Sequence, residues 1–332
     1  MKHIAIIGGG SWGTALAIAS SELGHSVKLW VYEPELVTLI NQSHCNEIYL
    51  KDFSIPQNVV ASNSLAKSLE AAQIVLTAVP ANHCRSLYQA MVPYLTPDMI
   101  FVSATKGIES KSLQRMSQIM EDLFSPSFQP RIAVISGPSF AKEVARGDPT
   151  AMVVAGPNKK INETIQSEFS GSTLRLYTNN DIVGVELAGA VKNVIAIAAG
   201  VCAGLGFGSN SLAAVVTRGL AEMTRLVTAC GGSRQTMSGL AGVGDLVLTC
   251  NGKLSRNRSV GFQLGQGRKL TEITAGMQTV AEGIPTTEAA LGLAKRYKIE
   301  MPITEQMNLL LHHNKNAHDV IKDLMERRLK NE

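Results

Sequence analysis

The chain has 332 residues, of which 45% are hydrophobic and 17% charged, so it can bury a large core and is not disordered as a whole. Chains of this length usually form about two domains. The net charge of +4 is small and no long basic run is present, which argues against nucleic acid as a partner and fits a small anionic substrate.

The sequence shows no sign of export, of a membrane span or of a metal site. Met1-Lys2-His3 leads directly into an apolar strand pattern, which leaves no room for a signal peptide. The most apolar stretch, residues 194–205, is too short to span a bilayer, so we interpret it as a buried helix and expect no integral membrane segment. The five cysteines are scattered without a C-x-x-C pair, and the histidines lack metal-binding spacing. We therefore expect a cytoplasmic protein with reduced thiols and no metal.

The N-terminal segment contains a glycine-rich turn between a predicted strand, residues 4–7, and a predicted helix that starts at residue 14. The turn reads G-G-G-S-W-G, which is G-x-G-x-x-G in the context in which it binds a dinucleotide. Gly8 permits the tight turn, Gly10 lets a pyrophosphate approach the backbone, and Gly13 allows close helix packing. The alternative is a turn that only packs a helix onto a sheet.

A second apolar strand is predicted at residues 27–31, and it ends just before Glu33. An acidic side chain about 20 residues after the glycine motif can accept hydrogen bonds from an adenosine ribose. Glu33 and the adjacent Tyr32 are therefore candidate cofactor-binding residues.

Strand and helix patterns continue to alternate through the first half of the chain. Further strands are predicted at 74–79, 99–104, 132–136, 151–155 and 174–177. This alternation predicts an N-terminal Rossmann-type domain over residues 1–180, with a doubly wound parallel sheet whose ligands bind beyond the carboxyl ends of the strands. Lys106 and Gly137-Pro138-Ser139 follow two such strand ends. The alternatives are a solvated turn lysine and a simple helix N-cap at Ser139.

Near residue 180 the strand patterns stop, and residues 181–332 predict an all-helical C-terminal domain. The expected helices are 181–203, 211–230, 240–249, 256–266, 286–297, 303–312 and 317–329. The overall expectation is an α/β protein with an all-α second domain.

Lys192 lies in a predicted helix that is apolar on nearly every side. Burial would disfavour its charged form and lower the pKa of the lysine, so a neutral amine could accept a proton from an alcohol. Asn193 follows directly and can orient a substrate oxygen. The alternatives are that Lys192 extends to the helix surface or forms a structural pair with Glu186.

Ser255, Arg256, Asn257 and Arg258 cluster where a helix is expected to begin. A planar guanidinium, a hydroxyl and a helix N-terminus together suit a phosphate group. A solvated basic face is the alternative. Asp245, earlier in the chain, could bond a substrate hydroxyl or hold a lysine.

Taken together, these segments resemble the bacterial NAD(P)-dependent glycerol-3-phosphate dehydrogenases, over essentially the whole chain. The resemblance rests on G-G-G-S-W-G-T-A-L-A (8–17), A-T-K-G-I-E (104–109), V-I-S-G-P-S-F-A-K-E (134–143), G-A-V-K-N-V-I-A-I-A-A-G (189–200), T-R-G-L-A-E-M (217–223), G-D-L-V-L-T-C (244–250), S-R-N-R (255–258) and V-A-E-G (280–283). The order and spacing of these segments make the match specific.

The resemblance implies a role for individual residues. Lys192 corresponds to the proton acceptor, and Lys106 to a residue that contacts cofactor and substrate and stabilises charge on the reacting oxygen. The implied substrate contacts are Lys106, Gly137, Ser139, Lys192, Asp245, Ser255, Arg256 and Asn257. The implied cofactor contacts are Ser11, Trp12, Lys106, Ala141, Arg256, Val280 and Glu282.

The implied reaction moves a hydride between NAD or NADP and carbon 2 of glycerol 3-phosphate, the partner substrate being dihydroxyacetone phosphate. Lys192 would take the hydroxyl proton in oxidation and return it in reduction. Membership would also imply a homodimer formed through the helical domain and a supply of glycerol 3-phosphate for phospholipid synthesis.

The sequence departs from the family at one position that bears on the cofactor. Many members carry an arginine just after the second strand, where it meets the 2′-phosphate of NADP, whereas this chain reads Val31-Tyr32-Glu33. The choice between NAD and NADP therefore stays open.

Two other interpretations explain part of the sequence. A two-domain dehydrogenase of the 3-hydroxyacid or 6-phosphogluconate type also joins a Rossmann domain to a helical one, but it is not expected to carry S-G-P-S-F-A and S-R-N-R together. A non-catalytic dinucleotide sensor would keep the glycine turn, but it would have no reason to keep Lys106, Lys192 and Arg256.

Overall fold

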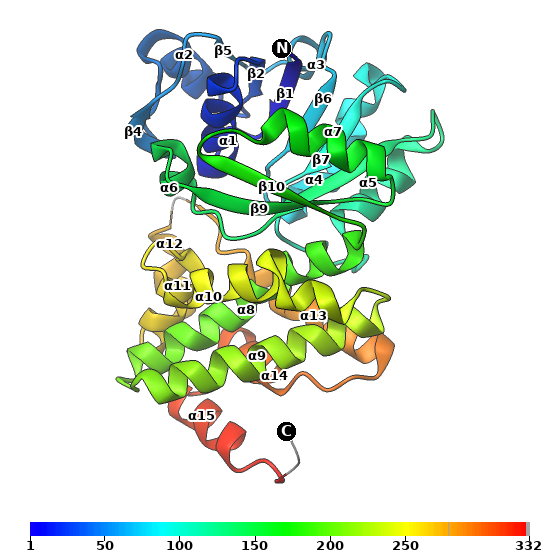
Figure 1. Ribbon diagram of the computed structural model, residues 1–332. Helices are drawn as coiled ribbons and strands as arrows, with labels where there is room; N and C mark the ends of the chain where they lie inside the picture. Colours follow the sequence, from blue (N-terminus) through cyan, green and yellow to red (C-terminus); the bar gives the residue numbers. More distant parts are fainter. Residues whose placement is uncertain (278, 330–332) are drawn as a thin grey trace. The chain divides into compact units, whose positions relative to one another are not determined.

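A computed structural model describes residues 1–277 and 279–329 of the chain. The chain divides into two compact units: unit 1 comprises residues 1–106 and 114–186, and unit 2 comprises residues 107–113 and the chain from 187 onward (Figure 1). The division falls within the first turns of helix α8 (Ile182–Gly204), shortly after the predicted boundary at residue 180. The short segment 107–113 joins unit 2, which local patterns did not indicate.

Unit 1 contains an eight-stranded sheet with the strand order β10-β9-β8-β7-β6-β1-β2-β5 (Figure 1). The strands are β1 (His3–Ile7), β2 (Ser26–Trp30), β5 (Val59–Ser62), β6 (Ile74–Thr77), β7 (Ile100–Ser103), β8 (Arg131–Ser136), β9 (Thr150–Ala155) and β10 (Leu174–Asn179). Every strand that the patterns predicted is present, with bounds that differ by a few residues. Strand β5 was not predicted, nor was the small antiparallel pair β3 (Cys45–Asn46) and β4 (Leu50–Ser54).

The sheet is parallel from β5 to β8, but not at its other edge. Strand β9 pairs antiparallel with β8, and β10 runs parallel to β9. The link between β8 and β9 contains only helix α6 (Ala141–Arg146), whose six residues rise about 9 Å, whereas a strand of that length spans about 20 Å. Because α6 is too short to return the chain to the start of β8, β9 runs back beside it. The prediction of a fully parallel sheet was wrong at this edge.

Helices pack on both faces of the sheet. One face carries α1 (Ser11–Glu22), α2 (Pro34–Ser43), α6 and α7 (Lys159–Phe169), and the other carries α3 (Leu65–Leu69), α4 (Ala81–Met91) and α5 (Met116–Phe124), with a 3-10 turn at Val92–Tyr94. Successive side chains of a strand point to opposite faces, so Ile4 and Ile6 belong to one core and Ala5 and Ile7 to the other. This confirms the doubly wound arrangement.

Unit 2 is built from helices. They are α8, α9 (Ser209–Ala229), a 3-10 helix η2 (Arg234–Ser238), a π-helix η3 (Leu240–Gly244), α10 (Asp245–Asn251), α11 (Arg256–Gly265), α12 (Leu270–Ala275), α13 (Gly283–Tyr297), α14 (Pro302–His312) and α15 (Ala317–Met325). Helix α12 and the 3-10 helix η2 lack counterparts among the predicted helices. Helix α8 is longer than the apolar stretch 194–205 from which a buried helix was predicted, and its length and composition would allow it to cross a bilayer. In the structure, however, 89% of its most apolar part is buried. The interpretation as a buried helix is confirmed.

Helices α8 and α11 contact each other through their backbones. A Cβ atom added at Gly200 would lie 2.1 Å from the carbonyl oxygen of Arg258, and one added at Gly261 would lie 2.0 Å from that of Ile197. No side chain fits at such distances, so glycine is required on both helices. This contact determines where the N-terminus of α11, with Ser255 as its N-cap, lies relative to α8.

Glu222 of α9 caps another helix of unit 2. Its side chain is 2% exposed, and it accepts hydrogen bonds from the backbone nitrogens of Ile303 (2.6 Å) and Thr304 (3.2 Å) at the start of α14. Burial raises the pKa of Glu222 from 4.5 to about 6, although these donors act in the opposite direction.

Replacing Glu222 with glutamine should lower the free energy of unfolding by about 1–3 kcal/mol, because the amide group leaves one buried N–H without an acceptor. Urea denaturation would measure the loss. A pKa that is raised in the folded state stabilises the protein below pH 4.5, and this contribution is lost as the pH rises through about 6. The variant should lack this dependence. Unchanged stability would mean that the cap at α14 is dispensable.

Candidate active site

The glycine turn after β1 has open space beside Gly10. Gly8 has a φ of 131°, and a Cβ atom there would lie 2.5 Å from the carbonyl oxygen of Ala78. A Cβ atom at Gly13 would lie 1.8 Å from the carbonyl oxygen of Gly8, so the start of α1 packs directly on the turn. At Gly10, by contrast, a Cβ atom would meet nothing within 4 Å. An anion can therefore approach the backbone here, and its binding stays a prediction.

Four other residues predicted to bind the cofactor lie close to this turn in the sequence and in unit 1. Trp12 is half-buried, and its indole nitrogen is buried without a hydrogen-bond partner among the described residues. Glu33 follows β2 and accepts a hydrogen bond from the hydroxyl of Tyr49 at 2.8 Å. Tyr32 is 77% exposed. Ser11 donates to the carbonyl oxygen of Tyr49 at 2.7 Å. The sequence had not indicated Tyr49, because it lies in the turn of the unpredicted β3–β4 hairpin.

Lys106 is held by the segment that follows β8. Its Nζ donates to the carbonyl oxygen of Gly137 at 2.8 Å and to Oγ of Ser139 at 3.2 Å. The lysine is half-buried, so it is not a freely solvated turn residue. Helix α6 begins at Ala141 with Phe140 as its N-cap, and the hydroxyl of Ser139 donates to the carbonyl oxygen of Gly137 instead. The alternative that Ser139 caps this helix is therefore wrong.

Lys192 is buried in unit 2 and paired with a carboxylate. It is 5% exposed, and its Nζ lies 2.5 Å from Oδ1 of Asp245, which is fully buried, and 2.8 Å from Oγ1 of Thr249. Of the two roles left open for Asp245, the structure shows that it holds a lysine. Glu186, the other suggested partner, accepts hydrogen bonds from Arg115 and from Ser117 of unit 1. Burial and the ion pair act in opposite directions on the charge of the amine.

Thr249 completes this arrangement, and it was not identified from the sequence. It lies one helical turn after Asp245 on α10, and its hydroxyl donates to the carbonyl oxygen of Asp245 at 2.6 Å. That bond leaves the threonine oxygen free to accept from Lys192. The sequence did contain one signal for Thr249: it lies four residues after Asp245, and residues four apart share one face of a helix.

An amide bridge lies beside Lys192. Asn257 donates to Oδ1 of Asn193 at 3.0 Å and accepts from the backbone nitrogen of Gly283 at 2.8 Å. It therefore joins α8 and α11 to the start of α13, directly after Glu282. Ser255 caps α11 by accepting from the backbone nitrogen of Arg258 at 3.2 Å.

Arg256, at the start of α11, has an exposed side chain. Desolvation by the surrounding protein lowers the pKa of the Arg256 guanidinium, and the charge of Glu282 acts in the opposite direction. Val280 is 40% exposed in the same loop as Glu282. Unit 2 thus brings Lys192, Asn193, Asp245, Ser255, Asn257 and the 280–283 loop together. Among the described residues, no group of three or more His, Cys, Asp or Glu could hold a metal.

A glycine turn open at a helix N-terminus, an acid after the second strand, and a buried lysine on a helical unit are typical of dehydrogenases that use a nicotinamide dinucleotide. Comparison with known proteins identifies the family. The profile described as "NAD-dependent glycerol-3-phosphate dehydrogenase N-terminus" matches residues 3–162, and the corresponding C-terminal profile matches residues 181–322. The chain belongs to the NAD-dependent glycerol-3-phosphate dehydrogenase family.

Individual relatives agree over the full length. The chain is 55% identical over 329 residues to a glycerol-3-phosphate dehydrogenase, NAD(P)+, of Koribacter versatilis, with 98% of each chain covered. It is 49% identical to one from Citrifermentans bemidjiense, covering 100% of this chain and 99% of the relative. The crystal structure of a glycerol-3-phosphate dehydrogenase from Coxiella burnetii matches with a TM-score of 0.94 and 39% identity, covering 98% of this chain and 99% of that one. The chain is thus an oxidoreductase that acts on a CH–OH group with NAD or NADP.

Proposed function

We propose that the protein reduces dihydroxyacetone phosphate to sn-glycerol 3-phosphate in the cytoplasm and so supplies phospholipid synthesis. The observation that carries the chemical part is Lys192, a buried amine held between Asp245 and Thr249 next to Asn193. A proton donor to a carbonyl oxygen must be held in a fixed place, and the contacts with Asp245 and Thr249 do this for the Nζ of Lys192.

The residues of unit 1 fit a dinucleotide. The open backbone at Gly10, the carboxylate of Glu33 and the buried indole nitrogen of Trp12, which has no hydrogen-bond partner in the part of the chain that the structure describes, would hold it. A bound nicotinamide supplies the hydride. In unit 2, Val280 and Glu282 are proposed as further contacts. In unit 1, Ala141 is proposed as one more.

The chain's own residues would act on the substrate as follows. Lys192, as an ammonium, donates a proton to the oxygen on carbon 2 during reduction, and takes one back from the hydroxyl during oxidation. Asp245 and Thr249 keep its Nζ in place. Lys106 stabilises charge on the reacting oxygen. Arg256 binds the phosphate through two parallel hydrogen bonds, and Ser255 starts the helix whose N-terminus favours an anion.

The test is to mix the purified protein with NADH or NADPH and dihydroxyacetone phosphate and to follow the absorbance of the reduced nicotinamide. We expect a substrate-dependent loss of absorbance and a product that is sn-glycerol 3-phosphate. Unphosphorylated dihydroxyacetone is the matched control and should react far more slowly. No oxidation of either cofactor would overturn the proposal. The cellular role predicts that a strain lacking the protein requires added glycerol 3-phosphate for growth.

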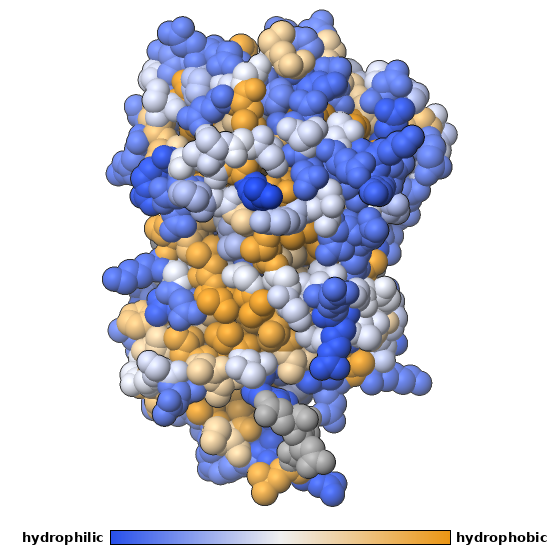
Figure 2. All heavy atoms as spheres, viewed as in Figure 1, coloured by the Kyte–Doolittle hydropathy of each residue, from blue (hydrophilic) through white to orange (hydrophobic). Residues whose placement is uncertain are grey.

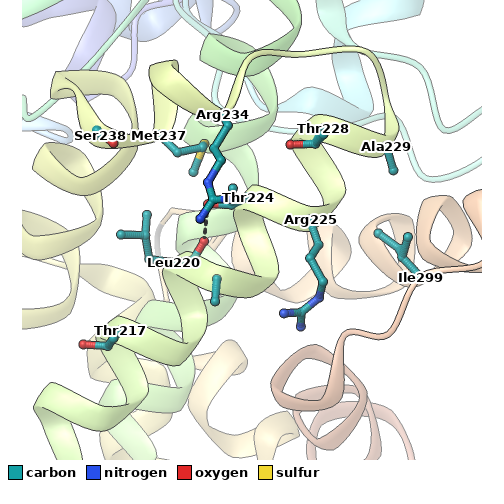
Figure 3. Close-up of a pocket in the computed structure, with 11 residues that line it drawn as sticks. Thr217, Leu220, Thr224, Arg225, Thr228, Ala229, Arg234, Met237, Ser238 and Ile299 are labelled. Atoms are coloured by element: carbon teal, nitrogen blue, oxygen red, sulfur yellow. Dashed lines mark hydrogen bonds between the residues drawn. The ribbon is translucent and has the colours of Figure 1, made fainter. Parts of the chain in front are cut away.

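We further propose a homodimer formed through the helical unit. A groove of about 700 Å³ runs along α9 of unit 2 (Figure 3). Figure 2 shows apolar surface over this part of the molecule. The groove is lined by Thr217, Leu220, Ala221, Thr224, Arg225, Thr228, Ala229, Arg234, Met237, Ser238 and Ile299. None of these residues belongs to the proposed active site, so a second copy could cover them without blocking the substrate.

Replacing Leu220, a half-buried residue of this groove, with glutamate should shift the protein toward the monomer, because a dimer would bury the new charge without a partner. Sedimentation equilibrium of the wild type and the variant would measure the shift. A wild type that sediments as a monomer at all concentrations would contradict the homodimer.

A further inference from the structure

Tyr49 makes a side-chain contact with the acid that follows β2. Its hydroxyl donates to Oε1 of Glu33 at 2.8 Å. Burial, and then the hydrogen bond and charge of Glu33, raise the pKa of Tyr49, so its hydroxyl keeps the proton that it donates. Glu33 stands at the N-cap position of α2, but its side chain does not cap that helix. The carboxylate is therefore oriented by Tyr49.

The backbone of Tyr49 is anchored to the glycine turn. Its carbonyl oxygen accepts from Ser11 at 2.7 Å, and its nitrogen donates to Asn46 at 3.1 Å. Asn46 is fully buried and donates in turn to the carbonyl oxygen of Gly9 and to the hydroxyl of Thr14, each at 2.8 Å. Through these bonds the β3–β4 hairpin holds Tyr49 in a defined place between the turn and Glu33.

The chain around Glu33 carries negative charge. Between Val31 and Leu50 there is no lysine or arginine, while Glu33, Glu35 and Glu47 are all present. A 2′-phosphate in this region would meet carboxylates and no guanidinium from this segment. A ribose with a free 2′-hydroxyl, by contrast, can donate to a carboxylate.

We propose that Tyr49 is a positioning residue that holds the carboxylate of Glu33 for the adenosine ribose, and that this pair makes the protein select NADH over NADPH. The proposal rests on the family's use of a nicotinamide dinucleotide. Tyr49 occupies Oε1 and leaves Oε2 to accept from the ribose. Because the carboxylate is ordered before the cofactor arrives, less ordering entropy is lost on binding.

The dissociation constants of NADH and NADPH, measured by calorimetry without substrate, test the selection directly. The wild type should bind NADH at least about tenfold more tightly than NADPH, since one charge-assisted hydrogen bond separates the two. Tyr49→Phe should weaken NADH binding by about three- to tenfold and change NADPH binding little, so that the ratio falls. Tyr94→Phe is the matched control, since it removes the hydroxyl of an exposed tyrosine of unit 1 that is not among the predicted cofactor contacts, and it should leave the ratio unchanged.

The role of Tyr49 as a positioning residue predicts non-additivity. Glu33→Gln should reduce the ratio further than Tyr49→Phe does, and adding Tyr49→Phe to Glu33→Gln should have almost no additional effect, because the carboxylate to be positioned is gone. Glu33→Arg should reverse the preference toward NADPH. A thermal melt of each variant would reveal a merely structural role, which would weaken both cofactors equally and lower the melting temperature.

Three results would overturn the inference. The first is a wild type that binds NADPH as tightly as NADH. The second is a Tyr49→Phe variant that changes both dissociation constants by the same factor, and the third is an equal effect of Tyr94→Phe. These constants are measured without dihydroxyacetone phosphate, so a failure of the proposed reaction would leave them readable.

Discussion

Replacing Lys192 with alanine should nearly abolish turnover of dihydroxyacetone phosphate while the reduced cofactor still binds. Loss of a general acid–base group typically costs about 10²–10⁴-fold in rate, and loss of the positive charge beside the reacting oxygen adds to it. Stopped-flow or steady-state rates would measure the loss of turnover, and cofactor titration would measure whether the reduced cofactor still binds. A variant that retains a tenth of the wild-type rate would exclude the role.

This substitution has a structural side effect that the experiment must separate from the chemistry. It leaves Asp245 buried without its ion-pair partner, which typically costs about 3–5 kcal/mol of stability. Lys192→Met carries the same cost, but its side chain fills the space that alanine leaves empty. Small primary amines added to the solution should therefore restore part of the rate to Lys192→Ala and none to Lys192→Met. Equal behaviour of the two variants would point to a loss of structure.

Arg256→Lys should reduce the catalytic efficiency for dihydroxyacetone phosphate by about ten- to a hundredfold, although the charge is kept. A guanidinium binds phosphate through two parallel hydrogen bonds and lysine offers a point charge, and one charged hydrogen bond contributes about 1.5–3 kcal/mol. The loss should be much smaller for unphosphorylated dihydroxyacetone. Measuring kcat/KM for both substrates would decide the matter.

One control variant and one further measurement are needed to interpret the Arg256→Lys result. Arg268→Lys makes the same change at an exposed arginine that follows α11, and it should leave both efficiencies unchanged. Equal losses for both substrates in Arg256→Lys would mean that the arginine acts on the cofactor or on the fold. Its proximity to Glu282, a proposed cofactor contact, makes cofactor affinity a necessary second measurement.

Features that depend on neighbouring residues could be predicted from the sequence. The glycine turn was predicted from its place directly after β1, and the burial of Lys192 was predicted from the apolar residues of the helix around it. The start of α11 at Arg256 was likewise visible, because Ser255 is a good N-cap. In each case the signal lies within one or two turns of the chain, where periodicity and capping act directly.

Features that depend on distant pairings could not be predicted in the same way. The patterns named Glu186 as a partner for Lys192 and left Asp245 to bond a substrate hydroxyl or to hold an unspecified lysine. The partner is Asp245, which approaches Lys192 only when α8 and α10 pack. Tyr49 lies in the turn of a hairpin whose first strand, β3, has only two residues and whose second strand, β4, is mostly exposed, so neither strand shows an apolar pattern. The reversal of β9 depends on the length of α6 compared with a strand, not on the composition of β9.

The close backbone contact between α8 and α11 limits which amino acids this protein can carry at the contact. Even one extra methyl group at Gly200, Gly204, Gly261 or Gly265 would collide with a carbonyl oxygen or main-chain carbon of the facing helix. Such a change would have to push α11 away, and with it the arginine and serine at its start, while leaving every functional side chain intact. A substitution at one of these glycines would therefore keep every residue of the proposed active site and change the distance between those on α8 and those on α11.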